Sequence, residues 1–241
     1  WGANAMSGVV NIITKSARET SGETLFDVSA GVFDRDAGST AGSGMGSLYQ
    51  MDVSTSQALN DRWSYRVGGG YSGSDPYARP VGRIPVIADP RDPSRSSTVG
   101  GAPYPLDADA PFGLGFKNSG TSRQRVNARV HQQLSDGLLT YSGGFSGTTG
   151  IIHTELGPFD IQPGSYMAYG MARYSRGAFR ASVFGNMVHG DPPNLLLPDP
   201  ATGGPLQLKF DNPTFDIELG HARAIGERQA LTYGGNYRRN D

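Results

Sequence analysis

The sequence predicts an all-β protein, part of an antiparallel transmembrane β-barrel, and three observations carry that prediction. Apolar and polar residues alternate in segments of about ten residues, which is typical of strands with two different faces. Short turns and long polar connections follow each other in strict order along the chain. Aromatic residues stand near the ends of the segments, as they do where a membrane-spanning strand meets the lipid headgroups.

The composition allows this fold and excludes several others. The chain has 241 residues, of which 37% are hydrophobic, and its mean hydropathy is -0.40. A barrel strand turns only alternate side chains to lipid, so a low mean hydropathy does not exclude it. No run of ~18 apolar residues occurs, which excludes a transmembrane helix. Eleven tyrosines and ten phenylalanines argue against a disordered chain, despite 35 glycines and 16 prolines.

Charge, cysteine content and motifs point away from several function classes. The net charge is -1, from 21 basic and 22 acidic residues, so there is no basic footprint for a nucleic acid. Without cysteine there is neither a disulfide framework nor a thiolate metal site. The glycine run at Gly42, Gly44 and Gly46 lacks the lysine and the helix of a phosphate-binding loop. We therefore expect no cofactor, no resident metal and no enzymatic activity.

Each predicted strand has one apolar and one polar phase. After Asp61, the residues Trp63, Tyr65 and Val67 share one phase, and small or polar residues occupy the other. The same pattern recurs along the chain, although Phe184 breaks it. It predicts nine strands, at 23–32, 46–58, 62–73, 121–134, 138–147, 166–175, 178–188, 213–224 and 229–239.

The connections alternate between tight and extended. Short turns stand at Asn60-Asp61, 135–137, Arg176-Gly177 and Gly226-Glu227, and Asn, Asp and Gly suit such turns. Long polar connections cover about 33–45, 74–120, 148–165 and 189–212. A meander of this kind places every long connection at one end. A transmembrane barrel has that asymmetry, whereas a soluble sandwich has no reason for it.

The first fifteen residues, WGANAMSGVVNIITK, form a second and independent signal. A turn at Gly2 and Asn4 leads into the pairs Val9-Val10 and Ile12-Ile13, which indicate a strand buried on both faces. The segment resembles the end of the plug domain in TonB-dependent outer-membrane receptors. The positions that match that family's pattern are Gly2, Ala5, Gly8, Val9, Val10, Asn11, Ile12, Ile13, Thr14 and Lys15.

The resemblance implies a domain division: residues 1–15 end the plug, and residues 16–241 form the N-terminal portion of the barrel. Barrels of this family have about 22 strands, so we expect the chain to be a fragment whose open edges keep it from forming a stable barrel alone. Most of the plug and the TonB box would lie upstream of Trp1.

The resemblance further implies a receptor in the bacterial cell outer membrane that takes up a large, scarce nutrient. The expected partners are outer-membrane lipid, the TonB–ExbB–ExbD complex and a ligand, with a ferric siderophore as the first expectation and cobalamin, haem or an oligosaccharide as others. Two other functions remain open from the residues alone: a passive outer-membrane porin, and a secreted β-sandwich binding module.

The candidate functional residues belong to three groups. A row of arginines is expected to point into the lumen, toward an anionic substrate or, as we favour, toward the plug; it comprises Arg66, Arg123, Arg125, Arg129 and Arg180. Two histidines stand near an acidic residue in predicted outer loops: His153 with Glu155, and His189 with Asp191. Their spacing matches no metal-binding signature, so we interpret them as solvated residues. The other two histidines, His131 and His221, add no metal-binding signature. The residues of a lipid-headgroup girdle are Trp63, Tyr65, Tyr71, Tyr166, Tyr169 and Tyr174.

Overall fold

A computed structural model describes residues 15–36, 43–76, 85–87, 97–98, 120–154, 157–226 and 229–240. The described part is all-β, with no helix in it long and apolar enough to span a membrane. All nine predicted strands are present. They are β1 Thr24–Asp36, β2 Ser43–Ala58, β3 Trp63–Ser74, β6 Thr121–Gln133, β7 Leu138–Thr154, β9 Tyr166–Arg176, β10 Phe179–Gly190, β13 Phe210–Ile225 and β14 Gln229–Asn240.

Five short strands lie inside segments that the sequence predicts as loops, and here the prediction was wrong. They are β4 Pro85–Ile87, β5 Ser97–Thr98, β8 Gly157–Ile161, β11 Pro193–Pro198 and β12 Pro205–Gln207. Strand β7 also runs seven residues beyond its predicted end at 147, and its extension pairs with β8. Regular alternation is weak in these segments, so the strand signal was missed.

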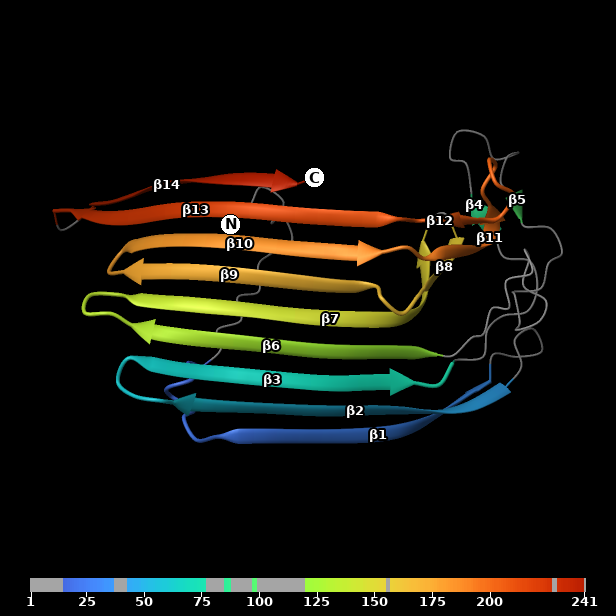
Figure 1. Ribbon diagram of the computed structural model, residues 1–241, viewed down its shortest axis with the longest axis horizontal. Coiled ribbons are helices and arrows are strands. Elements are labelled where there is room, and N and C mark those ends of the chain that lie inside the picture. The colour runs from blue at the N-terminus through green and yellow to red at the C-terminus, as the bar shows by residue number, and fades with distance from the viewer. Residues whose placement is uncertain are drawn as a thin grey trace.

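The nine long strands form one antiparallel meander. Their order in the sheet is β1-β2-β3-β6-β7-β9-β10-β13-β14, which is also their order in the chain. Because each strand pairs with the next, all the tight turns lie at one end and all the extended connections at the other (Figure 1). The predicted asymmetry of the connections is confirmed.

Turn chemistry explains the tight end. The side-chain Oδ1 of Asn60 accepts hydrogen bonds from the backbone N–H groups of Arg62 and Trp63, both at 2.9 Å, and so closes the β2–β3 turn. Gly177 and Gly226 have φ values of 53° and 64°, in the left-handed region that favours glycine. These turns set the register of the strands that they join.

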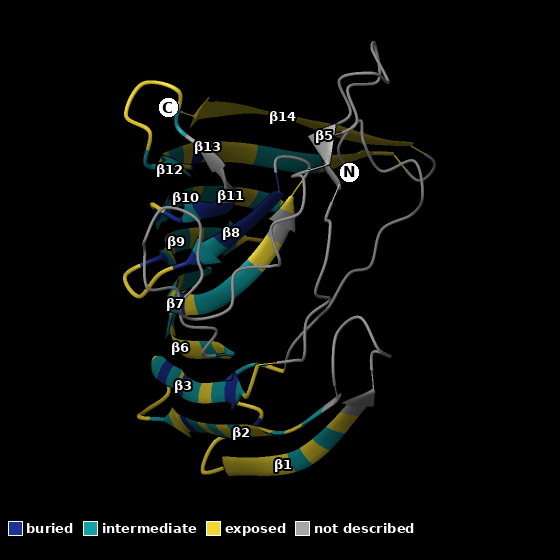
Figure 2. Cartoon of the chain, turned by 90° about the vertical axis from the view of Figure 1, so that its right-hand side faces the viewer, coloured by how far each residue is buried: buried dark blue, intermediate teal, exposed yellow. Residues whose placement is uncertain are grey.

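The sheet is curved and open. Seen along the strands, it follows an arc whose two edges, β1 and β14, bend toward the same side (Figure 2). The structure therefore shows an antiparallel β-sheet, not a closed barrel, among the described residues.

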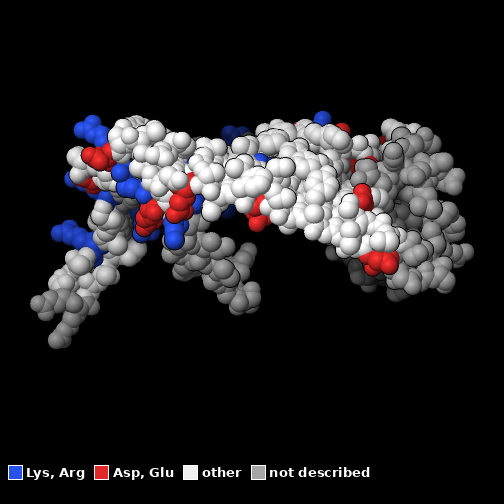
Figure 3. Space-filling view, turned by 90° about the horizontal axis from the view of Figure 1, so that it is seen from below, with Lys and Arg blue, Asp and Glu red and all other residues white. Residues whose placement is uncertain are grey.

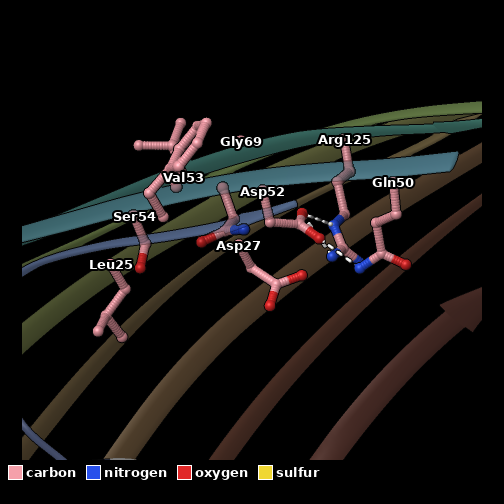
Figure 4. Close-up of a pocket in the computed structure, with 11 residues that line it drawn as sticks. Leu25, Asp27, Gln50, Asp52, Val53, Ser54, Gly69 and Arg125 are labelled. Carbon is pink, nitrogen blue, oxygen red and sulfur yellow. Dashed lines mark hydrogen bonds and ion pairs between the residues drawn. The ribbon is translucent and has the colours of Figure 1, made fainter. Parts of the chain in front are cut away.

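Strand pairing assigns every side chain of the meander to one of two faces. In one register row, Tyr65, Val130, Tyr141 and Ala172 lie side by side. In the next row, Arg66, Arg129, Ser142 and Met171 do so, on the opposite face. We call these the apolar face and the polar face. Figure 4 shows side chains of the polar face, among them Asp27, Asp52 and Arg125, on the hollow side of the arc.

The apolar face extends over all nine strands. Its large side chains are Phe26, Val28 and Val32 in β1; Tyr49, Met51 and Val53 in β2; Trp63, Tyr65, Val67 and Tyr71 in β3; Val126 and Val130 in β6; Leu139, Tyr141 and Phe145 in β7; Tyr166 and Tyr174 in β9; Phe179, Val183 and Met187 in β10; Phe215, Ile217 and Leu219 in β13; and Leu231, Tyr233 and Tyr237 in β14.

The few buried hydrophobic side chains lie outside these two faces. In the described part they are Ala17, Phe159, Ile161 and Leu195. The last three belong to β8 and β11, which pair with each other at the long-connection end. We call β8, β11 and β12 together the loop lobe. The main sheet therefore has no dry core of its own among the described residues.

The segment that leads into β1 is folded against the polar face. Ser16 and Glu19 exchange hydrogen bonds in a capping box: the Ser16 N–H donates to Glu19 Oε2 at 2.6 Å, and the Glu19 N–H donates to Ser16 Oγ at 3.2 Å. These bonds hold the pKa of Glu19 below its ordinary value. Thr20 Oγ1 lies 2.9 Å from Oγ of the buried Ser56 in β2. The chain thus enters the sheet from its polar side.

Candidate functional site

The apolar face is exposed over its whole width. Val28 is 59% exposed, Met51 52%, Val126 50% and Leu219 52%, and these four residues lie in four different strands. Single exposed hydrophobic residues are normal, but a contiguous apolar surface marks a site of interaction with a partner or with lipid. No described element packs over this face.

Aromatic rings border the apolar face near the tight turns. Tyr174 and Phe179 have ring centroids 6.2 Å apart, Phe179 and His221 6.4 Å, and His221 and Tyr233 5.3 Å. Four strands thus contribute to one row of rings. Rings with a polar atom at their edge suit the boundary between hydrocarbon and headgroups.

A second aromatic row borders the same face near the long connections. Phe145 and Tyr166 have ring centroids 5.5 Å apart, and Tyr166 and His189 5.3 Å. In β10, Phe179 and His189 mark the two rows and are ten positions apart. At ~3.3 Å per residue, a strand tilted by ~40°, as in transmembrane barrels, would separate the two rows by about 25 Å along the membrane normal, which is the height of the apolar band of such a barrel.

One member of the predicted girdle is misplaced. Tyr169 lies on the polar face, because it pairs with Gly144 and Asn186 of that face. Its ring stacks on Phe184 at 6.4 Å, and a side-chain Cβ at Gly144 would lie 2.6 Å from the Tyr169 ring. The prediction followed the position of Tyr169 near a strand end and overlooked its phase in the alternation.

The predicted arginine row does share one face, and that face is the polar one. Arg66 and Arg129 are direct partners across β3 and β6, and Arg123 and Arg125 lie in the same phase of β6. Arg180 shares the face from β10 but is separated from the other four by β7 and β9. The Nε atom of Arg66 is buried and has no hydrogen-bond partner among the described residues.

Arg125 forms an ion pair that the sequence analysis did not identify. Its Nε and Nη2 donate to Asp52 Oδ1 at 3.0 and 2.5 Å (Figure 4). Arg125 is in β6 and Asp52 is in β2, so the side chain reaches across β3 at Gly70, which pairs with both residues. The alternation in residues 46–58 places Asp52 on the polar side of its strand, as the sequence could have indicated. Its contact with Arg125 could not be predicted, because the two residues are 73 positions apart in the chain.

This ion pair depends on the missing side chain at Gly70. A Cβ atom there would overlap the carboxylate of Asp52. We expect Gly70→Ala to break the Arg125–Asp52 ion pair and to lower the stability of the folded protein by about 1 kcal/mol, the low end for overpacking. Denaturant unfolding of Gly70→Ala, of Asp52→Asn and of the double variant measures the loss of stability. Because both substitutions remove the same ion pair, the loss in the double variant should be smaller than the sum of the two single losses.

Gly220→Ala is the matched control, because Gly220 lies on the polar face of β13 and nothing lies within 4 Å of the place that a Cβ atom would take there. It should leave stability nearly unchanged. Equal losses for Gly70→Ala and Gly220→Ala would show that backbone preference, and not the ion pair, explains the effect.

Charged side chains are distributed unevenly along the strands. Seen from the β1 edge, acidic and basic side chains gather at the tight-turn end, and the middle of the surface in view is mostly uncharged (Figure 3). On the polar face, a second cross-strand ion pair joins Arg238 Nε to Asp216 Oδ2 at 2.9 Å. Charges within the polar face are thus partly neutralised by pairing between strands.

Asp75 closes the long-connection end of β2 and β3. Its carboxylate accepts hydrogen bonds from the backbone N–H of Ser47 at 2.8 Å and from Ser47 Oγ at 2.6 Å. The Asp75 N–H in turn donates to the Ser47 carbonyl at 2.8 Å. These donors stabilise the charged form and hold the pKa of Asp75 below its ordinary value.

The histidines form no metal centre in the part of the chain that the structure describes. His189 was interpreted as a solvated loop residue, but it lies in β10, and its Nδ1 is 2.6 Å from Oδ1 of Asp211. His131 Nδ1 lies 3.0 Å from Thr140 Oγ1 on the polar face, and His221 belongs to the aromatic row. The side chain of His153, with Glu155, falls outside the described residues.

The plug-end motif lies almost wholly outside the described residues, which begin at Lys15. Lys15 is exposed, and the segment after it contacts the polar face through Thr20 and Ser56. The other matched positions, from Gly2 to Thr14, have no structural description, so the assignment of residues 1–15 to a plug stays a prediction. No protein-family model matches the chain, and no curated protein matches it in sequence.

Proposed function

We propose that this chain is part of a TonB-dependent outer-membrane receptor: residues 1–15 end the plug domain, and residues 16–241 form an arc of the β-barrel. The observation that carries the proposal is the exposed apolar face, nine strands wide and bordered by two aromatic rows, opposite a polar face. A sheet with these two faces suits a boundary between lipid and a wet interior.

The open edges are consistent with an arc. An unpaired strand edge in hydrocarbon costs several kcal/mol for each unsatisfied backbone group. We therefore propose that further strands pair with β1 and β14 to close a barrel of about 22 strands. The hollow polar side would then surround the plug, and the segment 16–22, which packs on that side, would be the connection from plug to barrel.

Two other functions fit less well. A passive porin shares the two-faced sheet, but it has no use for the segment WGANAMSGVVNIITK, which resembles the end of a plug. A secreted β-sandwich module would cover its apolar face with a second sheet, and the described strands provide none over it.

The proposed activity is active uptake of a large, scarce nutrient, driven by the TonB–ExbB–ExbD complex through the plug. A ferric siderophore is the proposed substrate because it is the commonest in the family that the motif resembles. Arg66 is proposed to contact the plug, since its buried Nε needs an acceptor from outside the described residues.

Cell fractionation and uptake measurements test the proposal. We expect the full-length protein in the outer-membrane fraction, released only by detergent, and we expect its deletion to abolish TonB-dependent uptake of one ferric siderophore under iron limitation. A protein that stays monodisperse without detergent would support the β-sandwich function instead. Uptake that persists without TonB would support a porin.

A further inference from the structure

A cavity lies at the long-connection end of the polar face. It has a volume of about 310 Å³, within the range of small-molecule sites. Ile161, Met167, Val188 and Phe210 provide apolar walls, and they come from the four strands β8, β9, β10 and β13. Arg123 belongs to the predicted arginine row, but its apolar neighbours in this cavity were not predicted from the sequence.

The loop lobe and one glycine shape this cavity. Ile161 is buried where β8 folds back on β7, so the lobe contributes one wall. Gly190 is buried in β10, and a Cβ atom there would lie 2.6 Å from Cζ of Phe210 and 3.2 Å from Oγ of Ser165. The absence of a side chain at Gly190 therefore lets Phe210 line the cavity.

The polar groups of the cavity favour a negative charge. Arg123 lines it, and its Nε donates to Ser146 Oγ at 3.4 Å, a long hydrogen bond. A guanidinium carries four further N–H donors and keeps its charge at any physiological pH. Two other lining residues, Tyr166 and His189, have their side chains on the apolar face, where His189 pairs with Asp211 at 2.6 Å. Among the described residues, no acidic residue lines the cavity.

We propose that this cavity binds a small amphipathic organic anion: an aromatic or aliphatic body packs against Met167, Val188 and Phe210, and a carboxylate binds the guanidinium of Arg123. Methionine sulfur packs well against aromatic rings of different shapes, and the charged hydrogen bond fixes the orientation. The proposal concerns binding alone and does not depend on the proposed transport.

Methionine-methyl NMR of the full-length protein in lipid nanodiscs provides the test, with 2-naphthoate as the probe and neutral 2-naphthamide as its matched control. We expect 2-naphthoate to shift the Met167 methyl resonance saturably, and the amide to bind at least about tenfold more weakly, as loss of a charged hydrogen bond implies. The methyl group of Met51, exposed on the apolar face, reports simple partition into lipid.

Two variants locate the binding. Arg123→Gln should weaken 2-naphthoate about tenfold or more and leave the amide unchanged, whereas Arg180→Gln, on the same face but outside the cavity, should change neither. Val188→Phe should weaken both probes by filling the cavity, with Arg123 intact. Equal affinity for both probes, or unchanged binding in Arg123→Gln and Val188→Phe, would overturn the proposal. A Met167 methyl resonance that does not shift at a saturating concentration of 2-naphthoate would overturn it as well.

Discussion

Val183→Arg is expected to destabilise the folded protein in lipid by about 2–4 kcal/mol, the cost of an arginine at the midplane of a barrel wall. Val183 is 43% exposed on the apolar face of β10, between the aromatic residues Phe179 and His189 that mark the two rows. If this face contacts hydrocarbon, the charge has no partner there. Urea unfolding in lipid vesicles, followed by intrinsic fluorescence, measures the loss.

Ser182→Arg provides the matched control, since it adds the same side chain to the same strand one position away. Ser182 lies on the polar face and pairs with Glu218 of β13 and Arg173 of β9. A wet face with an acidic neighbour should accept the arginine, with a change below about 1 kcal/mol. Equal destabilisation by the two variants would contradict a lipid-facing apolar face, because a dry core tolerates neither charge.

Phe159→Ala is expected to unfold the loop lobe locally, with a loss of about 3–5 kcal/mol in the free energy that holds it closed. Phe159 is fully buried, and its backbone pairs with Ile152 of β7 and Asn194 of β11. The lobe thus joins the long connection after β7 to the one after β10. Hydrogen exchange should rise in β8 and β11 while the nine long strands stay protected.

Ile152→Ala is the control variant: it shortens a side chain at the neighbouring position in the same strand pair, but one that is not buried. Ile152 is the direct partner of Phe159 in β7 but is 43% exposed, so its truncation should cost far less and leave exchange in β11 nearly unchanged. If Phe159→Ala raised exchange throughout the main sheet, the lobe would be part of one cooperative unit with it. Such a result would contradict the separation into lobe and sheet.

The main sheet and the loop lobe differ in how much apolar surface they bury. The main sheet buries little and presents two extended faces, whereas the lobe contains most of the buried hydrophobic side chains in the described part. The proposed function accounts for this difference: if the apolar face of the main sheet contacts lipid, lipid covers its apolar side chains and no dry core is needed. The loop lobe buries its own apolar side chains, Phe159, Ile161 and Leu195.

The proposed anion site illustrates what alternation alone leaves out. Phe184 breaks the predicted pattern of its strand, and in the structure it lies on the polar face beside Met171 and stacks on Tyr169. Met167 and Val188 extend this apolar patch to the cavity. The residues of β9 and β10 that depart from the alternation therefore form an apolar patch on the polar face, next to the cavity.

The amino-acid sequence by itself determined the nine strands, their two faces and the asymmetry of their connections. It did so because a strand repeats every two residues, so that the alternation of residues such as Trp63, Tyr65 and Val67 fixes which side chains share a face. The asymmetry followed from the spacing of the turn residues. Both properties are local, and neither needs a contact between distant segments.

Only the tertiary structure decided which residues meet. The ion pair of Arg125 with Asp52, the pairing of His189 with Asp211 and the burial of Phe159 all depend on strand register or on loops folding back, and several conformations of similar local preference compete for such contacts. Register is a collective property of the whole sheet, set by every neighbouring strand at once. For that reason the faces could be predicted from the sequence, whereas the partners across them could not.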